Sequence, residues 1–548
     1  MNGAPIEFER VADVPDGGVL FALPALLLYG LLDKSREIFS MPEGFYPLES
    51  IFLLLALMAL GRIPSLESLR YVAPGEWGKL IGLDRIPEVR TLRQKLSKLC
   101  SQRGRAERWS GLLAKQWMEG EAQSSAGVFY ADGHVRLYHG KLTALPRRYV
   151  ARERLCLRGT TDYWINAMDG RPFFMVSYPV DPGLLNVLEH NIVPRLRAEA
   201  HGQPSEEQLA ADRCSSRFCI VFDREGYSPD FFARMKEQRI AVLTYHKYPG
   251  EPWPEQEFRT QWVSLVNGEV VELQLAERGV RLSNDLWVRE VRQRSKSGAQ
   301  SSILSTDYRS DLSRVAAAMF ARWCQENFFR YMRQHYNLDR LVEYGVEPLP
   351  DTTRVINPPW RAFDSQIRSQ NALLSRERAR FAEIQLAQQL EPEQVQAYEL
   401  SKGQLQQAIE KRCQDIEQLK TQRKAVPKHI LVKDLPEQDR FQQLRAEKKH
   451  FLDTIKLIAY RAETALAQLA REKMHRLDDA RSLIRQVFRT EVDLIPDHQN
   501  KTLTVHLHPL TAEVHDEVVK HLCEELTSTE TVFPCTDLRL VYEIAGSG

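Results

Sequence analysis

The sequence predicts a multidomain α/β protein, and two observations support this prediction. The segment Arg217–Lys247 holds two short apolar runs, Phe218–Phe222 and Ile240–Leu243, separated by a polar, helix-forming stretch. Apolar runs of this length are typical of strands that are buried on both faces of a sheet. The chain also has 548 residues, which is too long for a single core, so three or four domains are expected.

The composition is that of an ordinary globular protein, with 43% apolar and 27% charged residues. The net charge is only +1, so any binding of nucleic acid must depend on local basic patches. Eight cysteines without a Cys-x2-Cys pair argue against a structural zinc site and favour a reducing compartment. The most apolar runs, 19–32 and 51–60, are shorter than the roughly 18 residues that cross a bilayer. Without a recognisable signal peptide, the expected location is the cytoplasm, in association with the nucleoid.

Residues 1–120 predict a helical domain for DNA binding or dimerisation. Apolar helices are expected near 19–32 and 49–60, and short helices that end in a basic helix follow them. Between Lys79 and Arg108, nine Lys and Arg stand against three Asp and Glu. Such an array is compatible with a helix-turn-helix-like contact with DNA, or with a packing domain whose basic face is solvated. The candidate DNA-binding residues are Arg90, Arg93 and Lys95.

Residues 121–345 predict the central α/β domain. A strand at Val128–Ala131 leads to Asp132, and a hairpin then turns at Asp169–Gly170. The apolar spacing from Leu184 to Ala200 predicts an amphipathic helix. The first half of the domain is therefore expected to pair a strand that ends in an acid with a hairpin and a helix.

The second half of this domain repeats the pattern of strand, acid and helix. The next strand stops at Asp223, and Ser228 is the expected N-cap of the helix after it. Short strand-like runs with turn signals between about 250 and 305 indicate a β-rich insertion. Asp311 is then expected to cap a helix that continues to about Tyr336.

Three carboxylates stand out by their position in this order of elements. Asp132 and Asp223 each end a strand, and Glu326 lies in the last helix. Open α/β sheets usually keep their sites at the carboxyl ends of strands. The order of hairpin, helix, strand with acid, helix, strand and acidic helix is that of a ribonuclease-H-like fold, in which three such acids converge at one edge of the sheet.

Carboxylates in this arrangement suit magnesium or manganese, because hard cations prefer oxygen ligands. Two such ions roughly 3.5–4 Å apart can activate an attacking oxygen and stabilise the leaving oxygen of a phosphodiester. A side-chain nucleophile is then not required. The sequence has no GxxxxGK, GxGxxG or GxSxG motif, so a nucleotide cofactor is not expected.

The helix around Glu326 also resembles a known family signature, Tyr-x2-Arg-x3-Glu-x6-Lys. This chain has Arg322-x3-Glu326-x6-Arg333, with Met319 where the signature has Tyr and Arg333 where it has Lys. The stretches YADGHVRLYHG, VFDREGYSPDFFARMKEQ and LIPDHQNKTLTVHLH resemble uncharacterised bacterial transposases. The chain is thus similar to the DDE transposases of bacterial insertion sequences, in the group with a β-rich insertion before the Glu.

This resemblance implies a reaction and its partners. Asp132, Asp223 and Glu326 would bind two Mg²⁺ or Mn²⁺ ions, water would nick double-stranded DNA at the element's terminal repeats, and the freed 3′ hydroxyl would attack target DNA. Arg322 and Arg333 would hold phosphates, although surface ion pairs are the alternative. A homodimer is expected because two element ends must be held together. Further arginines would line the DNA path, or lie on a solvated loop, namely Arg147, Arg148, Arg152 and Arg158.

Other residues near these acids are weaker candidates. Glu225 follows Asp223 closely enough to take part in metal binding, but a local pairing or cap is the simpler role. Asp307 is expected to cap a turn or helix, and His134 faces the same side of its strand as Asp132. Two histidines alternate on a strand near the C-terminus, where a metal site or an exposed strand face would explain them: His506 and His508.

The C-terminal third predicts a helical arm over 346–490 and a small α/β tail over 491–548. Two runs with heptad-like apolar spacing, 405–419 and 451–469, are separated by Pro427 and Pro436 and predict an antiparallel coiled-coil hairpin. For the whole chain, two alternatives to a transposase remain open. One is a nuclease of the same fold that cuts without strand transfer, and the other is a non-catalytic DNA-binding relic.

Overall fold

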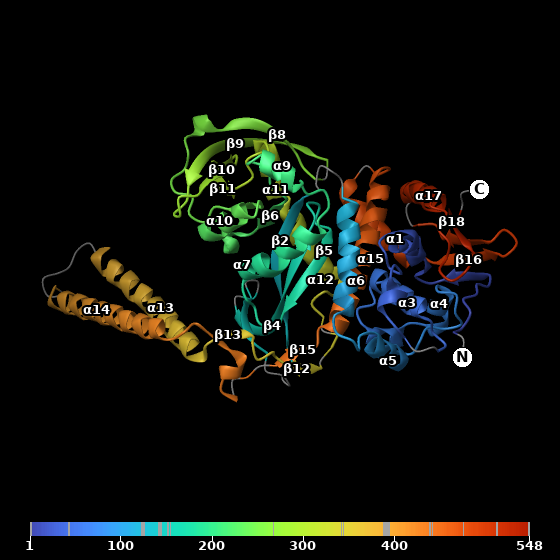
Figure 1. Ribbon diagram of the computed structural model, residues 1–548, viewed down its shortest axis with the longest axis horizontal. Helices are drawn as coiled ribbons and strands as arrows, with labels where there is room; N and C mark the ends of the chain where they lie inside the picture. Colours follow the sequence, from blue (N-terminus) through green and yellow to red (C-terminus); the bar gives the residue numbers. More distant parts are fainter. Residues whose placement is uncertain are drawn as a thin grey trace.

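The computed structural model shows a mixed α/β protein built around one large sheet (Figure 1). It describes residues 3–545 except 42–43, 122–126, 141–144, 151–152, 154, 267, 341, 344, 387–394, 438–439, 441, 475 and 511–512. Within these ranges, no helix combines the length and apolarity needed to cross a bilayer.

The described residues place ten strands in the large sheet, in the order β3-β4-β2-β6-β7-β11-β10-β9-β8, with β5 paired to β4. The strands β2, β6 and β7 are parallel, and the others pair antiparallel. Their bounds are β2 Val128–Leu137, β3 Arg147–Val150, β4 Leu155–Asn166, β5 Pro172–Tyr178, β6 Cys219–Phe222, β7 Ala241–Tyr245, β8 Arg259–Ser264, β9 Val270–Arg281, β10 Trp287–Arg294 and β11 Gln300–Ser305.

The β-rich insertion continues this sheet. Its last strand, β11, pairs with β7 from Leu243↔Ser305 to Tyr245↔Ile303, so β8–β11 extend the parallel strands sideways. The predicted hairpin is also present, with β4 and β5 on either side of Asp169–Gly170. The predicted helix from Leu184 begins as expected and contains a π-helical turn at Leu188–Ile192, between α7 (Leu184–Val187) and α8 (Val193–Glu199).

The helix predicted after Asp311 is divided in two. Asp311 caps α11 (Leu312–Phe320) as expected, with its carboxylate accepting from a backbone N–H of the first turn at 2.7 Å. A second helix, α12 (Arg322–Tyr336), begins two residues after α11 ends. At the break, the Tyr130 hydroxyl donates to the Ala318 carbonyl at 2.6 Å. A continuous helix would offer this carbonyl to the N–H four residues later, so the β2 side chain stabilises the break.

The N-terminal and C-terminal segments fold together, instead of forming the separate domain and tail that were expected. Strand β1 (Val11–Val14) pairs with β16 (Val492–Asp497) in a sheet of order β1-β16-β17-β18. The other two strands are β17 (Thr502–Leu507) and β18 (Arg539–Ile544), and α17 (Glu513–Ser528) packs on β18. Figure 1 shows the blue N-terminal helices beside the red C-terminal elements.

The predicted coiled-coil pairing of runs 405–419 and 451–469 is wrong. The second run lies in α15 (Glu447–Arg471), which packs against α3 (Leu48–Leu60) and α6 (Arg105–Glu119). Aromatic contacts explain why α15 packs there and not against α14, because the ring of Phe451 lies 5.2 Å from that of Phe52 and 5.7 Å from that of Trp109. The apolar face of α15 is therefore buried in the N-terminal core.

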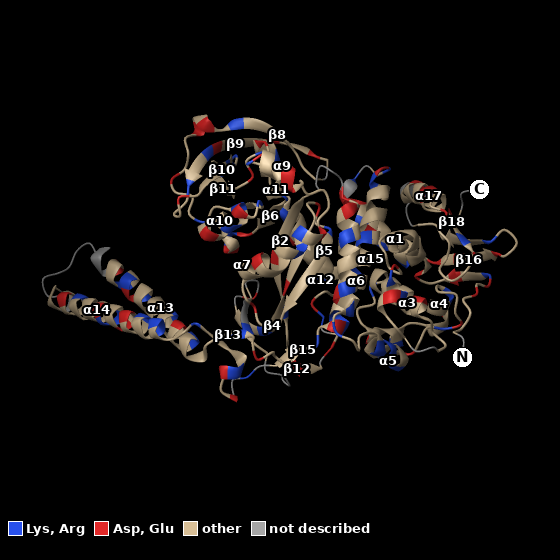
Figure 2. Ribbon diagram, viewed as in Figure 1, with Lys and Arg blue, Asp and Glu red and all other residues tan. Residues whose placement is uncertain are grey.

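The first run belongs to a helical arm. Its helix, α14 (Val395–Ala425), packs along α13 (Pro358–Leu386), and the pair projects from the body of the molecule (Figure 1). Basic and acidic residues are interspersed along the arm (Figure 2). The remaining principal elements are α1 Leu23–Leu28, α2 Ser35–Ile38, α4 Pro74–Lys79, α5 Val89–Leu99, α9 Glu206–Ala211, α10 Pro229–Glu237, α16 Ala480–Arg489, β12 Val346–Pro348, β13 Arg354–Ile356, β14 His429–Leu431 and β15 Gln442–Leu444.

Candidate active site at the edge of the central sheet

Asp132 and Asp223 lie side by side on neighbouring parallel strands. The last residue pair of β2 and β6 is Ala131↔Phe222, and each aspartate is the next residue in the chain. Strand β6 ends before Asp223 as expected, but β2 continues through Asp132 to Leu137 because that half pairs with β4, so the prediction that a strand ends at Asp132 is wrong. Neighbouring strands are about 4.8 Å apart, so the two backbones hold both carboxylates at one place. Each side chain is half-buried, and each accepts one backbone hydrogen bond, from Gly133 N–H at 2.8 Å and Arg224 N–H at 2.7 Å respectively.

Because these two carboxyl groups are close together, the charge of Asp223 affects the pKa of Asp132. The pKa of Asp132 is raised to about 6, mainly by burial and in smaller part by the charge of Asp223, against the opposing effect of the Arg322 guanidinium. A desolvated carboxylate beside a second one is stabilised by any cation placed between them. The site therefore favours bound positive charge.

Glu326 lies on α12 and is paired with Arg322. The two residues form an ion pair across one turn of α12, and the guanidinium of Arg322 also acts on Asp132. The carboxylate oxygens of the three acids do not all lie within 4.8 Å of one another. Glu326 is thus paired with an arginine whose charge acts on Asp132, and the convergence of all three acids on one metal site stays a prediction.

Hydrogen bonds from the residue before Glu326 fix the position of α12. The buried amide of Gln325 donates to the Tyr130 carbonyl at 3.2 Å and to Asn166 Oδ1 at 2.8 Å. Asn166 in turn donates to the Gly170 carbonyl at 2.8 Å. Gly170 has φ of +87°, and a Cβ there would lie 2.6 Å from a backbone oxygen of α12. Only glycine therefore allows the turn to approach the helix so closely.

One face of β2 lies along the two helices. Alternate residues of a strand share a face, so Tyr130, Asp132 and His134 point the same way. The His134 ring stacks on Phe329 of α12, with centroids 5.2 Å apart, and its Nε2 pairs with Asp339 just beyond that helix. His134 therefore contacts the helix that carries Glu326, and its role beside the acids stays a prediction.

A cavity of about 460 Å³ opens next to these residues. It is bounded by α12 on one side and by the β-rich insertion on the other, and its lining includes Arg322, Trp323, Glu326, Leu265 and Leu273. The Trp323 side chain is largely exposed. Sequence reasoning missed this residue, although an aromatic side chain three positions before the acid, on a polar helix face, was a usable signal.

The other candidates near the acids have local partners. Arg333 pairs with Asp339 at 3.2 Å and is half-exposed, so a phosphate contact stays a prediction for it. Asp307 accepts hydrogen bonds from Arg309 N–H at 3.0 Å and Ser310 N–H at 3.2 Å, which confirms its expected role as a turn cap. Glu225 is exposed in the turn after Asp223.

The two histidines near the C-terminus share a carboxylate partner. Asp493 lies within 3.3 Å of His506 Nδ1 and within 3.0 Å of His508 Nε2, on adjacent strands of the small sheet. Possible ligand atoms of Asp13, Glu491 and His508 also lie within 4.8 Å of one another. This group is on the small sheet, separate from the acidic edge of the large one.

The predicted basic loop lies away from the acids. Arg147 and Arg158 are paired across β3 and β4 and line a hollow of about 490 Å³ with His139. Asp132 is opposite Trp164 on β4, six residues from Arg158, which is roughly 20 Å at about 3.3 Å per residue. For Arg148 only the backbone pairing with Leu157 is described. Arg152 lies outside the described residues.

The predicted basic helix is present as α5, with mixed roles for its basic residues. Arg90 is exposed, Arg93 pairs with Glu67, and Lys95 donates to the Tyr46 carbonyl at 2.9 Å. Lys95 is therefore engaged in holding a neighbouring loop. DNA binding by α5 stays a prediction that depends mainly on Arg90 and Arg93.

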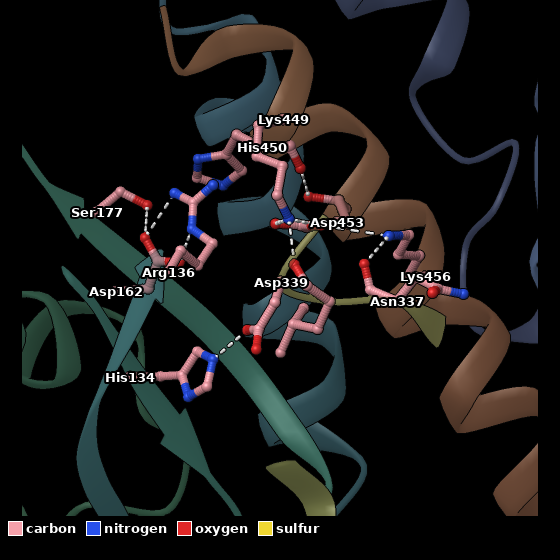
Figure 3. Close-up of polar contacts among 12 residues, drawn as sticks. His134, Arg136, Asp162, Ser177, Asn337, Asp339, Lys449, His450, Asp453 and Lys456 are labelled. Atoms are coloured by element: carbon pink, nitrogen blue, oxygen red, sulfur yellow. Dashed lines mark hydrogen bonds and ion pairs between the residues drawn. The ribbon is translucent and has the colours of Figure 1, made fainter. Parts of the chain in front are cut away.

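A buried polar network joins the sheet to α15 (Figure 3). Arg136 of β2 donates to Asp162 at 2.9 Å, and the Ser177 hydroxyl donates to the same oxygen at 2.6 Å. On α15, Lys449 pairs with Asp453, whose charge also acts on Arg136. Sequence reasoning missed this network, and only the i,i+4 spacing of Lys449 and Asp453 indicated a pairing.

These features define an α/β protein with an acidic site at the edge of its main sheet. A family model described as "Transposase protein" matches residues 1–546, so the chain belongs to this family of transposases. Transposases process DNA and therefore bind it. A search of curated proteins gave no match.

Proposed function

We propose that this transposase is of the DDE type, cutting DNA at the ends of its element and joining the freed ends to target DNA. The observation that carries the proposal is the register that puts Asp132 beside Asp223, with Glu326 linked to them through Arg322. Among transposases, three acids at one sheet edge are the arrangement that such chemistry requires.

The order of strands supports a ribonuclease-H-like core. Around the acids, antiparallel β4 borders β2, and β2, β6 and β7 run parallel. In this proposal, α12 carries Glu326 to the same edge, supported by the charge of its partner Arg322 acting on Asp132. This is the order of elements that the sequence predicted for that fold.

The three acids fit divalent cations, because they offer hard oxygen ligands and because burial and the neighbouring Asp223 raise the pKa of Asp132. Asp132, Asp223 and Glu326 would hold two Mg²⁺ or Mn²⁺ ions. When bound, such ions activate the attacking oxygen and stabilise the leaving oxygen of a phosphodiester. Arg322 orients Glu326 through their ion pair and supplies positive charge beside the acids, where a DNA phosphate would lie.

A homodimer on double-stranded DNA is part of this proposal, since two element ends must be cut and joined together. The projecting arm of α13 and α14 is the surface we assign to dimer contacts. Sedimentation of the full chain, free and bound to DNA, tests this part. A protein that stays monomeric in both states would contradict it.

The main test is cleavage of a labelled duplex that carries the ends of the element encoding this chain. Reactions contain Mg²⁺ or EDTA, with the wild type, Asp223→Asn, or the control Glu237→Gln, which alters an exposed acid at the end of α10. We expect nicking that requires Mg²⁺, survives in the control and is lost in Asp223→Asn.

Each other outcome assigns a different function. Cutting that persists in Asp223→Asn would place the active site elsewhere. Cutting without joined products would favour a nuclease of the same fold, and DNA binding without cutting in any reaction would favour a non-catalytic relic.

A further inference from the structure

The small sheet presents metal-binding side chain types on one face. Its strands β1, β16 and β17 are neighbours in the order of the sheet. On β17 and just after it, His506 and His508 share a face, and Asp493 of β16 is the register partner of His506. The His508 N–H donates to the carbonyl of Glu491 at 3.0 Å, so these two residues are also opposite each other. The face therefore combines two imidazoles with two carboxylates.

A bulge in β1 adds a third carboxylate to this face. Between Val11 and Val14, β1 carries one residue more than the paired part of β16. Asp13 lies in this bulge with φ of +55°, in the left-handed region that a non-glycine residue adopts at a cost. Its N–H donates to Asp493 Oδ1 at 3.0 Å. Bulges commonly redirect a side chain, and this one holds Asp13 beside the histidines.

The distances within the group suit ligands of a single ion. Asp13 Oδ1 is 3.7 Å from Nε2 of His508, and Glu491 Oε2 is 3.8 Å from Nδ1 of the same ring. One possible ligand atom from each of these three residues lies within 4.8 Å of the other two. An ion with tetrahedral bonds of about 2.1 Å holds its ligand atoms about 3.4 Å apart. Both carboxylates are exposed, so small side-chain rotations can bring them to that separation.

Asp493 orients two members of the group. Its Oδ1 lies 3.0 Å from Nε2 of His508 and also accepts the N–H of Asp13. Its Oδ2 lies 3.3 Å from Nδ1 of His506. A histidine that binds a metal usually gives its other ring nitrogen to a carboxylate, which fixes the orientation of the ring. Asp493 is placed to be that carboxylate for His508.

The charges on this face favour a bound cation. In the described part of the chain, the ion pairs of Asp13, Glu491 and Asp493 are with the two histidines, and none is with an arginine or a lysine. Three carboxylates thus lie together without a permanent positive charge. Imidazole and carboxylate ligands in combination suit Zn²⁺ and similar transition-metal ions, whereas Mg²⁺ prefers oxygen ligands alone.

We propose that Asp13, Glu491 and His508 bind one divalent transition-metal ion of the Zn²⁺ type, with Asp493 as a positioning residue. The ligands come from β1 and from the adjoining ends of β16 and β17. The ion therefore ties the N-terminal strand to the C-terminal sheet. This site does not depend on the proposed DNA chemistry, which takes place at the large sheet.

Zinc titration calorimetry on the full chain tests the proposal. Every protein carries Asp132→Asn and Asp223→Asn, so that ions bound at the large sheet contribute little. The site variants added to this parent are His508→Gln and Asp13→Asn. The matched control is His498→Gln, which alters an exposed histidine in the turn between β16 and β17. Thermal unfolding in EDTA checks that each variant is folded, and Asp13→Asn, which changes only an exposed side chain, still tests the site if His508→Gln is not folded.

We expect each site variant to weaken Zn²⁺ binding by more than about tenfold, and the control by less than about twofold. Asp493→Asn should weaken binding by about tenfold, because it alters the partner of a ligand and not a ligand itself. Excess Mg²⁺ should not displace the Zn²⁺. Equal Zn²⁺ affinity of the parent and both site variants would overturn the proposal.

Two further measurements test the position of the ion and its effect. Anomalous diffraction at the zinc edge should give a peak between Asp13, Glu491 and His508, and a zinc peak only at other residues would contradict the assignment. Hydrogen exchange of the β1 amides should slow when Zn²⁺ is added to the parent but not to His508→Gln. Exchange that Zn²⁺ leaves unchanged in both proteins would show that no ion ties β1 to the sheet.

Discussion

The ring of His134 stacks on the ring of Phe329, with centroids 5.2 Å apart and planes 13° from parallel. His134 lies two residues after Asp132 on β2, and Phe329 lies three residues after Glu326 on α12. This one contact therefore joins the strand and the helix that carry two of the three acids. Its removal should loosen the site without removing an acid.

Replacing His134 by alanine should lower the free energy of unfolding by about 1–2 kcal/mol, because the variant can neither stack on Phe329 nor pair with Asp339. Phe329→Ala should cost more, about 3 kcal/mol, since this side chain is buried. Urea denaturation of the single and double variants measures the coupling, with the exposed His139→Ala as control. Additive effects of the two substitutions would show that the rings do not interact.

Gln325→Leu should reduce DNA cleavage while DNA binding is retained. The substitution leaves the Tyr130 carbonyl and Asn166 without their buried donor, which costs about 1–3 kcal/mol and allows α12 to shift. The matched control is Gln404→Leu, an exposed glutamine in the helix α14. Equal cleavage by both variants, measured at a temperature where both are folded, would show that Gln325 does not position Glu326.

The raised pKa of Asp132 predicts a pH dependence of stability. Its ordinary value is 3.8 and its value in the folded protein is about 6, mainly because of burial, with Asp223 adding to the effect. The folded state therefore holds this proton more tightly, so this residue's contribution to stability falls as pH rises from 3.8 to about 6. Asp132→Asn should remove the effect and stabilise the metal-free protein at pH 7 by about 2–3 kcal/mol.

Thermal unfolding across pH 4–8 checks this prediction, with the exposed Asp478→Asn as control. The stability difference between Asp132→Asn and the wild type should grow up to about pH 6 and then level off. Mn²⁺ should stabilise the wild type more than the variant if the acids bind the ion. A difference that stays constant with pH would mean that Asp132 titrates normally.

Lys449→Met should destabilise the protein by about 3–5 kcal/mol, because it leaves the fully buried Asp453 with the more distant Lys456, 4.0 Å away, in place of its close ion-pair partner. The double variant Lys449→Met/Asp453→Leu should recover most of this stability, since an apolar pair carries no buried charge. Urea denaturation measures both. Lys520→Met, in an exposed i,i+3 pair with Glu517, is the control and should change stability by less than about 1 kcal/mol. A double variant as unstable as the single one would contradict the prediction.

The acids and their strands were predictable because the signals are local. The apolar run that stops at Asp223 marks a buried strand and its polar end, whereas the run before Asp132 marks only the first part of β2, which continues to Leu137. The N-cap Ser228, the cap Asp311 and the turn at Asp169–Gly170 were likewise visible as short patterns, and the structure confirms them. Such patterns depend on backbone geometry within a few residues.

The errors concern partners that are distant in sequence. The apolar spacing in α15 is compatible both with a coiled-coil arm and with a buried core helix. The helix is buried in the core because Phe451 packs against the rings of Phe52 and Trp109, more than 300 residues away in the sequence. The pairing of β1 with β16 is of the same kind. Periodicity shows that a face is apolar but not which other element covers it.

By itself, the sequence determined the α/β class, the strand that ends before Asp223, and the helix that carries Glu326. Tertiary structure alone decided that the charge of Arg322, the ion-pair partner of Glu326, acts on Asp132, and that Gln325 and His134 hold α12 against β2. The physical reason is that strands and helices form from local patterns, whereas ion pairs, buried networks and grooves arise where packing brings distant segments together.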